Sequence, residues 1–435
     1  MTGAETRYRL DASVQRFGTT VVGGSPLTLF RLTDSGRAAV DRLAGGDPVR
    51  RTPLVDRLLD AGAIHPLPER TTLRAADVTV VMPAFGPIGR VPDGTILVDD
   101  GSIPPLPGAT IRLDENQGPA AARNAGLAAV TTPLVAFVDA DVLLPDGWLD
   151  GLLPHFDDAR VGAVAPRIRS PRRPGLLGRY ERSHGPLDLG DEPARVRAGS
   201  RVSYVPAAVL VCRTEAVRDL GGFDETLRFG EDVDLVWRLD EAGRSVRYEP
   251  SVVADHEPRP TWAAWVRQRA GYGSSAAPLA RRHPGRLAPL RMSGWSLGAW
   301  LLVTIGRPLL GAAVGLGSAA ALVPKLPDVP PAQAFRIAAV GNARAGEQIA
   351  RAVRRAWLPL VALAAVRSRT ARAVLVASLL ESRHPLVAAD DAAYCAGVWR
   401  GMIAERTLDP IVPDIVSWPG GRRRSWRPSH YRHSS

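Results

Sequence analysis

The stretch Leu134–Asp141, with the sequence LVAFVDAD, decides the fold class. Its first five residues form a continuous apolar run, which is typical of a strand that is buried on both faces of a parallel sheet. Similar apolar runs occupy residues 78–83 (VTVVMP) and 95–100 (TILVDD), and a helix is predicted over 120–130. Strands that alternate with helices in this way predict an α/β domain with a mixed, mostly parallel sheet.

The α/β pattern continues to about residue 283. Further strands are predicted over 161–166, 202–212 and 245–250, and a further helix over 233–242. We therefore expect one α/β domain over residues 75–283, of the size that carries a catalytic site.

Residues 1–74 form a separate small module with short β-like runs and helices predicted over 35–43 and 53–61. Its pattern predicts a winged-helix-like shape. It is similar to the peptide-recognition modules that accompany enzymes acting on ribosomally made peptides. The alternative is a module that only packs against the rest of the chain.

Residues 284–420 are rich in Ala, Leu, Val and Arg, and helices are predicted over 333–356 and 357–380. The apolar stretch 294–324 is interrupted by Arg307 and Pro308, so each piece is shorter than the ~20 residues that cross a bilayer. Basic helices beside an apolar hairpin indicate attachment to the cytoplasmic face of a membrane, as a peripheral or monotopic protein. The alternative is a helical bundle packed on the catalytic domain or on a second copy. Residues 421–435 are predicted to be a disordered basic tail.

The composition limits the partners and the compartment. The chain has 435 residues, a formal net charge of +11 and two cysteines, Cys212 and Cys395. Two isolated cysteines favour a reducing, cytoplasmic location over a disulfide framework. The charge is compatible with nucleic acid, an anionic membrane or a phosphate-bearing substrate. Nucleic acid is disfavoured because basic and aromatic residues do not interleave outside the tail.

Acidic residues follow two of the predicted strands. Asp99 and Asp100 end the run at 95–100, and Asp139 and Asp141 follow the run at 134–138. Ligands of open parallel sheets bind beyond the carboxyl ends of the strands. Asp99 and Asp100 can therefore accept hydrogen bonds from a nucleoside, unless they only form a turn. Two carboxylates one residue apart, as in Asp139 and Asp141, suit a divalent cation that neutralises a diphosphate.

Three further residues are candidates for the same site. Arg123 stands among small residues on the helix predicted over 120–130, where it can reach a phosphate or orient the carboxylates. Glu231 and Asp232 precede the helix over 233–242, and acids at a helix start are also favoured by its dipole. Transfer of a group to a hydroxyl needs a carboxylate base, and Asp232 is the candidate.

Taken in order, six motifs resemble the family 2 glycosyltransferases of the GT-A fold: VVMPAFG, ILVDDGS, NQGPAAARNAGL, FVDADV, GGFDE and GEDVDLVWRL. The resemblance covers residues 78–256. It implies that Pro83, Asp99, Asp100 and Arg123 serve the nucleotide of a UDP-sugar donor. It also implies that Asp141 and Asp139 hold Mn²⁺ or Mg²⁺ on the diphosphate, with Asp139 shared between the two roles.

The resemblance further implies that Asp232 is the base of an inverting displacement, with Glu231 beside it binding hydroxyl groups. His256 lies where some relatives have another metal ligand. The alternative interpretation is that His256 is a surface histidine without a role in binding. The family usually ends its first strand in Pro-x-Tyr-Asn, whereas this chain has Pro83-Ala84-Phe85-Gly86. A Gln-x-x-Arg-Trp motif, typical of processive synthases, is absent from the sequence.

The whole layout resembles more narrowly the glycosyltransferases of mycofactocin biosynthesis. That resemblance implies transfer of glucose from UDP-glucose to a hydroxyl of a peptide-derived redox cofactor, premycofactocin, and the growth of a short β-glucan. Two alternatives stay open from the sequence. One is transfer to a membrane polyprenyl phosphate or a cell-wall glycan, and the other is a non-catalytic scaffold that holds a peptide or a membrane.

Overall fold

The computed structural model describes residues 5–69, 71–89 and 91–417. The chain divides into two compact units, residues 1–287 with 396–407 and residues 288–395 with 408–435, and each is described by itself. The tail predicted over 421–435 lies outside the described residues. The domain limits at residues 74, 283 and 420 stay a prediction.

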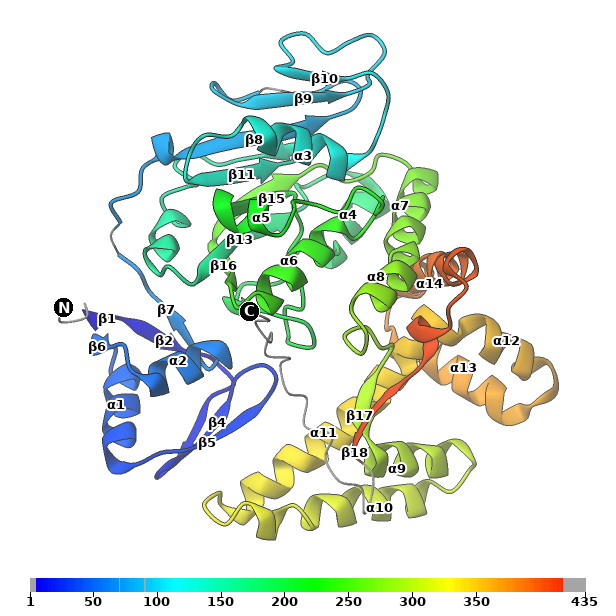
Figure 1. Cartoon of the computed structure of the whole chain (residues 1–435). Helices are drawn as coiled ribbons and strands as arrows, with labels where there is room; N and C mark the ends of the chain where they lie inside the picture. The colour runs from blue at the N-terminus through cyan, green and yellow to red at the C-terminus, as the bar shows by residue number, and fades with distance from the viewer. Residues whose placement is uncertain (1–4, 70, 90, 418–435) are drawn as a thin grey trace, which may run out of the picture. The chain divides into compact units, whose positions relative to one another are not determined.

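The first unit begins with a small α/β module (Figure 1). Its helices α1 (Asp34–Ala44) and α2 (Pro53–Asp60) are capped by the side chains of Thr33 and Thr52. The strands form a three-stranded meander and two short pairs: β3 (Gln15–Phe17), β4 (Thr20–Gly23) and β5 (Thr28–Arg31); β1 (Glu5–Thr6) with β6 (Val49–Arg50); and β2 (Tyr8–Leu10) with β7 (Ile64–Pro66). The module encloses its own apolar core, which includes Phe30, Leu58 and Ile64.

The rest of the first unit is built on one nine-stranded sheet. Its strand order is β10-β9-β8-β11-β15-β13-β16-β12, and β14 also pairs with β16. The strands are β8 (Val78–Ala84), β9 (Ile96–Asp100), β10 (Ile111–Leu113), β11 (Leu134–Val138), β12 (Val142–Leu143), β13 (Val161–Arg169), β14 (Ala194–Val196), β15 (Val209–Arg213) and β16 (Ser245–His256). Strands β10, β9, β8 and β11 run parallel, as do β13 and β16, whereas β15, β12 and β14 are antiparallel to their neighbours. The mixed, mostly parallel sheet is confirmed.

Two apolar cores lie against this sheet. One core joins the sheet to α3 (Pro119–Ala129), α5 (Thr214–Asp219) and α6 (Glu231–Glu241), and the other contains η2 (Leu153–Asp157). The unit also contains α4 (Gly175–His184), α7 (Trp262–Ser274) and α8 (Ala276–Arg282). Residues of β11 alternate between the two cores, because successive side chains of a strand point to opposite faces of the sheet. This explains why the sequence of β11 is apolar throughout.

The strand expected over 202–212 is wrong in its first half. Only Val209–Arg213 forms a strand, and residues 202–208 form a loop. Two backbone groups at the end of this loop bond to acidic residues: Ala207 N–H donates to the Asp232 carboxylate, and Ala208 C=O accepts from the backbone N–H of Asp139 at 2.9 Å, next to the pairing of β11 with β15. The apolar composition of residues 202–208 does not distinguish such a loop from a buried strand.

The second unit is mainly helical. It contains α9 (Gly294–Thr304), α10 (Pro308–Ala320), η3 (Val323–Lys325), α11 (Pro331–Ala352), the π-turn Val353–Trp357, α12 (Leu358–Arg367) and α13 (Arg369–Glu381). Strands β17 (Arg291–Ser293) and β18 (Asp414–Ser417) pair in parallel, a short turn (Asp409–Ile411) precedes β18, and α14 (Pro385–Glu405) runs from this unit into the first. The single helix expected over 357–380 is wrong: it is split at Ser368, which is extended and caps α13 through the backbone N–H of Ala371.

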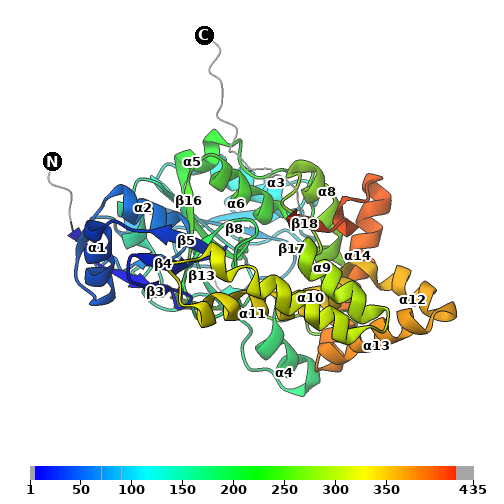
Figure 2. The ribbon, with the colours of Figure 1, turned by 90° about the horizontal axis from the view of Figure 1, so that it is seen from below.

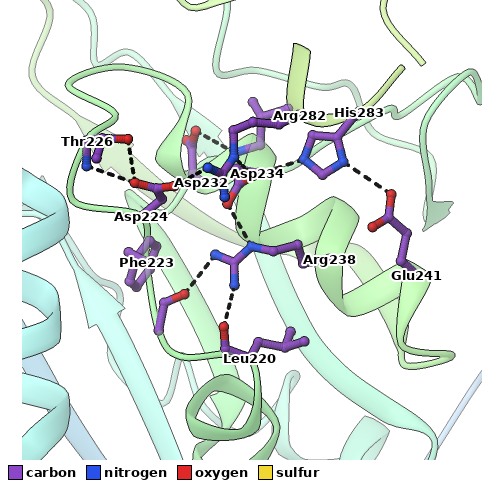
Figure 3. A network of polar contacts seen from close by, with 12 residues as sticks. Leu220, Phe223, Asp224, Thr226, Asp232, Asp234, Arg238, Glu241, Arg282 and His283 are labelled. Carbon is purple, nitrogen blue, oxygen red and sulfur yellow. Dashed lines mark hydrogen bonds and ion pairs between the residues drawn. The ribbon is translucent and has the colours of Figure 1, made fainter. Parts of the chain in front are cut away.

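A network of ion pairs around Asp234 anchors α6 (Figure 3). The Asp234 carboxylate is fully buried and accepts from Arg238 on the same helix at 2.7 Å. It also contacts Arg282 at the end of α8 at 2.7 Å, and His283 at 2.9 Å. Arg238 donates in addition to the carbonyl groups of Leu220 and Gly222. The start of α6 is therefore fixed from both sides.

Asp234→Asn should destabilise the first unit, because the substitution keeps the shape but removes the buried negative charge that Arg238 and Arg282 bind. Loss of one partner from a buried ion pair costs about 3–5 kcal/mol of unfolding free energy. Urea unfolding at pH 7 measures this loss. Asp219→Asn, at an exposed position on α5, is the matched control and should change the unfolding free energy by less than about 0.5 kcal/mol.

The difference in unfolding free energy between wild type and Asp234→Asn should depend on pH. Burial alone would raise the pKa of Asp234, but the hydrogen bonds from His283, Arg282 and Arg238 outweigh it and hold this pKa below the ordinary value. The stabilisation is therefore present above the ordinary aspartate pKa and is lost as the pH falls through the folded-state value. Wild type and Asp234→Asn should converge in acid, and equal stabilities at pH 7 would contradict the anchoring role.

Candidate active site

Residues from four separate parts of the sequence meet at one edge of the sheet. Asp139 and Asp141 follow the end of β11, and His256 ends β16. Arg123 comes from α3, and Glu231 opens α6 together with Asp232. The candidate site is thus assembled from residues that are up to 133 positions apart in the sequence.

Asp139, Asp141 and His256 form a group with the geometry of a metal site. Each offers one ligand atom, and these atoms all lie within 4.8 Å of one another. The short strand β12 explains the contact, because its pairing places Val142 opposite His256 and so brings Asp141 beside the imidazole. The His256 Nε2 to Asp141 Oδ1 distance is 3.3 Å. Two carboxylates and one imidazole fit a divalent cation such as Mn²⁺.

Arg123 links the group of Asp139, Asp141 and His256 to the start of α6. One terminal nitrogen donates to Asp139 Oδ1 at 2.7 Å, and the other donates to Glu231 Oε1 at 2.8 Å. The guanidinium is buried and lies over the ring of Phe223, 5.3 Å from its centroid. Arg123 is therefore not a solvated surface residue, and both of its terminal nitrogens already bind carboxylates.

Glu231 and Asp232 have environments that favour the protonated acid. Burial, followed by the neighbouring Asp232 charge, raises the pKa of Glu231 to about 7, although Arg123 acts in the opposite direction. Burial also raises the pKa of Asp232. The Asp232 side chain accepts from the backbone N–H of Val233 at 2.8 Å and of Ala207 at 3.3 Å, and it stays partly exposed. A partly exposed carboxylate with a raised pKa suits a general base.

Asp99 and Asp100 lie at the carboxyl end of β9 and hold two loops in place. Burial opposes ionisation of Asp99, yet donors from Ser102, Leu106 and Arg112 outweigh it and lower the pKa to about 2. Asp100 accepts from the backbone N–H groups of Gln117 and Gly118, at 2.8 and 2.9 Å. The two carboxylates thus shape the loops over 101–106 and 116–118. Within the described part of the chain, neither carboxylate forms a hydrogen bond or ion pair with Arg123 or with the acids that Arg123 binds.

Pro83, the remaining predicted site residue, lies in β8 opposite Val98 of β9. It is partly buried one position before the end of the strand. Pro83 therefore lies on the strand next to β9, which carries Asp99 and Asp100, the other residues that the sequence resemblance assigns to the nucleotide.

Two contributors were missed by reasoning from the sequence. The backbone of Ala207 and Ala208 binds Asp232 and Asp139, and nothing in two alanines signals this. Asn124 bonds to the backbone of Phe223 in both directions and donates to Glu225, which fixes the loop that leads to α6. The position of this asparagine beside Arg123 was a usable signal.

Comparison with known proteins gives the family. The sequence profile "Glycosyltransferase like family 2" matches residues 95–272. A protein of Mycobacterium tuberculosis (strain H37Rv) named "Pre-mycofactocin glycosyltransferase" is 41% identical over 448 residues, which cover 92% of this chain and 95% of the relative. A poly-beta-1,6-N-acetyl-D-glucosamine synthase of Staphylococcus aureus (strain COL) is 27% identical over 143 residues, 32% of this chain and 34% of the relative.

Among solved structures, a mannosyltransferase of Pyrobaculum calidifontis, in complex with GDP-Man and Mn²⁺, aligns with a TM-score of 0.41 at 18% identity, covering 76% of this chain and 88% of that one. The likeness over nearly the full length of the mycobacterial protein shows the family. The chain belongs to the family 2 glycosyltransferases and has the GT-A fold. The enzyme class expected from the sequence is confirmed.

Arg123→Lys should lower kcat/KM for sugar transfer about 100-fold, because an ammonium group lacks the planar fork that holds Asp139 and Glu231 together, and small misplacements of catalytic groups cost this much. Steady-state kinetics measure the fall. The affinity of the protein for added Mn²⁺, measured by titration, should also fall, because Asp139 loses its orientation. Arg244→Gln, which removes an exposed ion pair with Glu215, is the control and should change neither quantity more than about twofold. Full kcat/KM in Arg123→Lys would exclude the bridging role.

The acidic limb of the pH–rate profile should have its midpoint at a higher pH than is usual for carboxylates. The pKa values of Glu231 and Asp232 are raised, and a carboxylate base at Asp232 would have to be ionised, so we expect kcat/KM to increase with pH into the neutral range. Glu231→Gln removes a neighbouring negative charge, so the pKa of Asp232 falls and the limb moves to lower pH. Profiles measured at saturating metal test this. An unmoved limb would show that the two carboxylates do not titrate together.

Proposed function

We propose that this enzyme transfers glucose from UDP-glucose to a hydroxyl of peptide-derived premycofactocin, with inversion to a β-linkage, and that repeated transfer builds a short β-glucan. The observation that carries the proposal is the 41% identity to the mycobacterial pre-mycofactocin glycosyltransferase over nearly the whole of both chains. The small N-terminal module, in the same compact unit as the site, is consistent with a peptide-derived acceptor.

Asp139, Asp141 and His256 would hold the divalent cation, Mn²⁺ or Mg²⁺. When bound, the cation supplies positive charge that neutralises the departing diphosphate. Pro83, Asp99 and Asp100 belong to the nucleotide side, where the two aspartates fix the loops that would surround the uracil and ribose. The mixed set of oxygen and nitrogen ligands favours Mn²⁺ over Mg²⁺, which prefers oxygen ligands.

Asp232 is the proposed base. Its partly exposed carboxylate would take the proton from the acceptor hydroxyl as the oxygen attacks the anomeric carbon from the side opposite the diphosphate. The backbone N–H groups of Val233 and Ala207 orient the carboxylate during this step. Glu231 binds a hydroxyl of the donor or the acceptor, and Arg123 keeps Glu231 at a fixed distance from Asp139.

The location proposed with this activity is the cytoplasm, with peripheral or monotopic attachment to the inner face of the membrane. Among the described residues, one helical segment, 308–325, is long and apolar enough to cross a bilayer, and it is 11% buried.

The purified full chain, incubated with UDP-glucose, Mn²⁺ and premycofactocin, should give products that are heavier by successive hexose units, as measured by mass spectrometry. Asp232→Asn, which preserves shape but cannot accept the proton, should lower the rate at least 1,000-fold, and Asp219→Asn should not. Chelation of the metal should stop transfer, and added Mn²⁺ should restore it. Failure to add hexose or release UDP would refute the proposal, whereas transfer only to a polyprenyl phosphate or glycan would replace its acceptor.

A further inference from the structure

Two helical hairpins of the second unit leave large apolar side chains exposed. In the hairpin of α9 and α10 these are Trp295, Leu301, Ile305, Leu309, Leu310 and Leu316, and Leu309 is 85% exposed. In the hairpin of α12 and α13 they are Leu360, Leu363, Val366, Val376, Leu379 and Leu380. No residue of α12 is buried, and Ser378 is the buried residue of α13. Apolar surface gathered in this way marks an interaction site.

The inner side of the first hairpin is already occupied. Asn342 on α11 accepts from Ser296 on α9 at 2.6 Å, and it donates to Gly315 and Ser318 on α10 at 2.9 and 3.0 Å. The indole N–H of Trp300 also donates to the Asn342 carbonyl. These bonds fix α9 and α10 on α11, so the apolar residues that remain exposed form the outer face of the hairpin.

The loops that close the hairpins carry arginine. Arg307 stands between α9 and α10, and Arg367 and Arg369 flank the break between α12 and α13; all three are exposed. Over residues 294–383 the sequence has eleven basic and three acidic residues. One of the acids, Glu381, is paired with Arg354 at 2.6 Å. A strongly positive charge at the ends of apolar helices complements anionic lipid headgroups.

Helices α9 and α10 are each shorter than the hydrocarbon core, although the longer segment 308–325, which contains α10, is by length and composition able to cross it. Helix α9 has 11 residues and α10 has 13, so at 1.5 Å per residue each is ~20 Å or less, against ~30 Å for the hydrocarbon core. Helix α9 packs against α13, and the closing loops of both hairpins lie toward the same side of the unit (Figures 1 and 2). This geometry suits insertion of both ends into one leaflet.

We propose that the exposed faces and closing loops of the α9–α10 and α12–α13 hairpins dock the enzyme on an anionic lipid bilayer, by insertion into one leaflet without crossing it. The inference deepens the location part of the proposed function. A second copy of the chain is the other candidate occupant. It is disfavoured because symmetric pairing would bring the arginines of both copies together.

Vesicle flotation tests the docking surface without any substrate. The purified full chain should float with vesicles of phosphatidylcholine and phosphatidylglycerol (7:3), and salt should weaken binding. Pure phosphatidylcholine should bind at least tenfold less. The double variants Leu309→Glu with Leu310→Glu, and Leu363→Glu with Val366→Glu, should each lower partition at least tenfold. Leu176→Glu with Val266→Glu, at exposed apolar positions of the first unit, is the matched control.

Arg307→Gln with Arg369→Gln keeps the apolar faces and should reduce binding to anionic vesicles alone. Helicity by circular dichroism and hexose transfer to a soluble acceptor should persist in all variants, so a failure of docking is distinct from a failure of catalysis. Wild-type protein that does not float, or hairpin variants that float as well as wild type, would overturn the proposal. A dimer in light scattering that the hairpin variants dissociate, without lipid binding, would assign the surface to a second copy.

Discussion

The buried guanidinium of Arg123 is the interaction on which the site depends. It joins Asp139, which follows a central strand, to Glu231, which starts a helix 92 residues later in the sequence. A buried arginine is costly unless it is paired, and two carboxylates at 2.7 and 2.8 Å provide the pairing. Its Nε has no hydrogen-bond partner in the described part of the chain, so the two ion pairs must also offset that loss. The arrangement fixes the metal-binding group and the proposed base relative to each other.

The acids of the first unit divide into two groups by environment. Asp99 and Asp234 are surrounded by donors and cations, which lower their pKa values, and they hold loops and helices. Glu231 is buried and Asp232 is partly buried, and this loss of solvent raises the pKa values of both. Perturbation toward the protonated form, at the meeting point of several strands, is characteristic of acid–base chemistry. The same residue types therefore serve stability in one place and reaction in another.

Negative and positive charges that matter for function lie in different units of the chain. Acidic residues concentrate at the sheet edge of the first unit, where the proposed ligands are a cation and a sugar nucleotide. The arginines of the second unit accompany apolar hairpins instead. The net charge of +11 therefore does not indicate the charge of the candidate active site. It combines a negatively charged site in one unit with a positively charged, apolar surface in the other.

The sequence by itself determined the fold class, most strands of the sheet, and the residues Asp139, Asp141, Glu231 and Asp232, because buried strands leave continuous apolar runs and their carboxyl ends leave acids. It missed the loop over 202–208 and the break at Ser368, where apolar composition gives no sign of backbone conformation. Tertiary structure alone decided that His256 meets Asp141 and that Arg123 bridges two carboxylates. Those contacts depend on strand pairing and on burial. Both bring together residues that are far apart in the sequence, so no local sequence pattern predicts them.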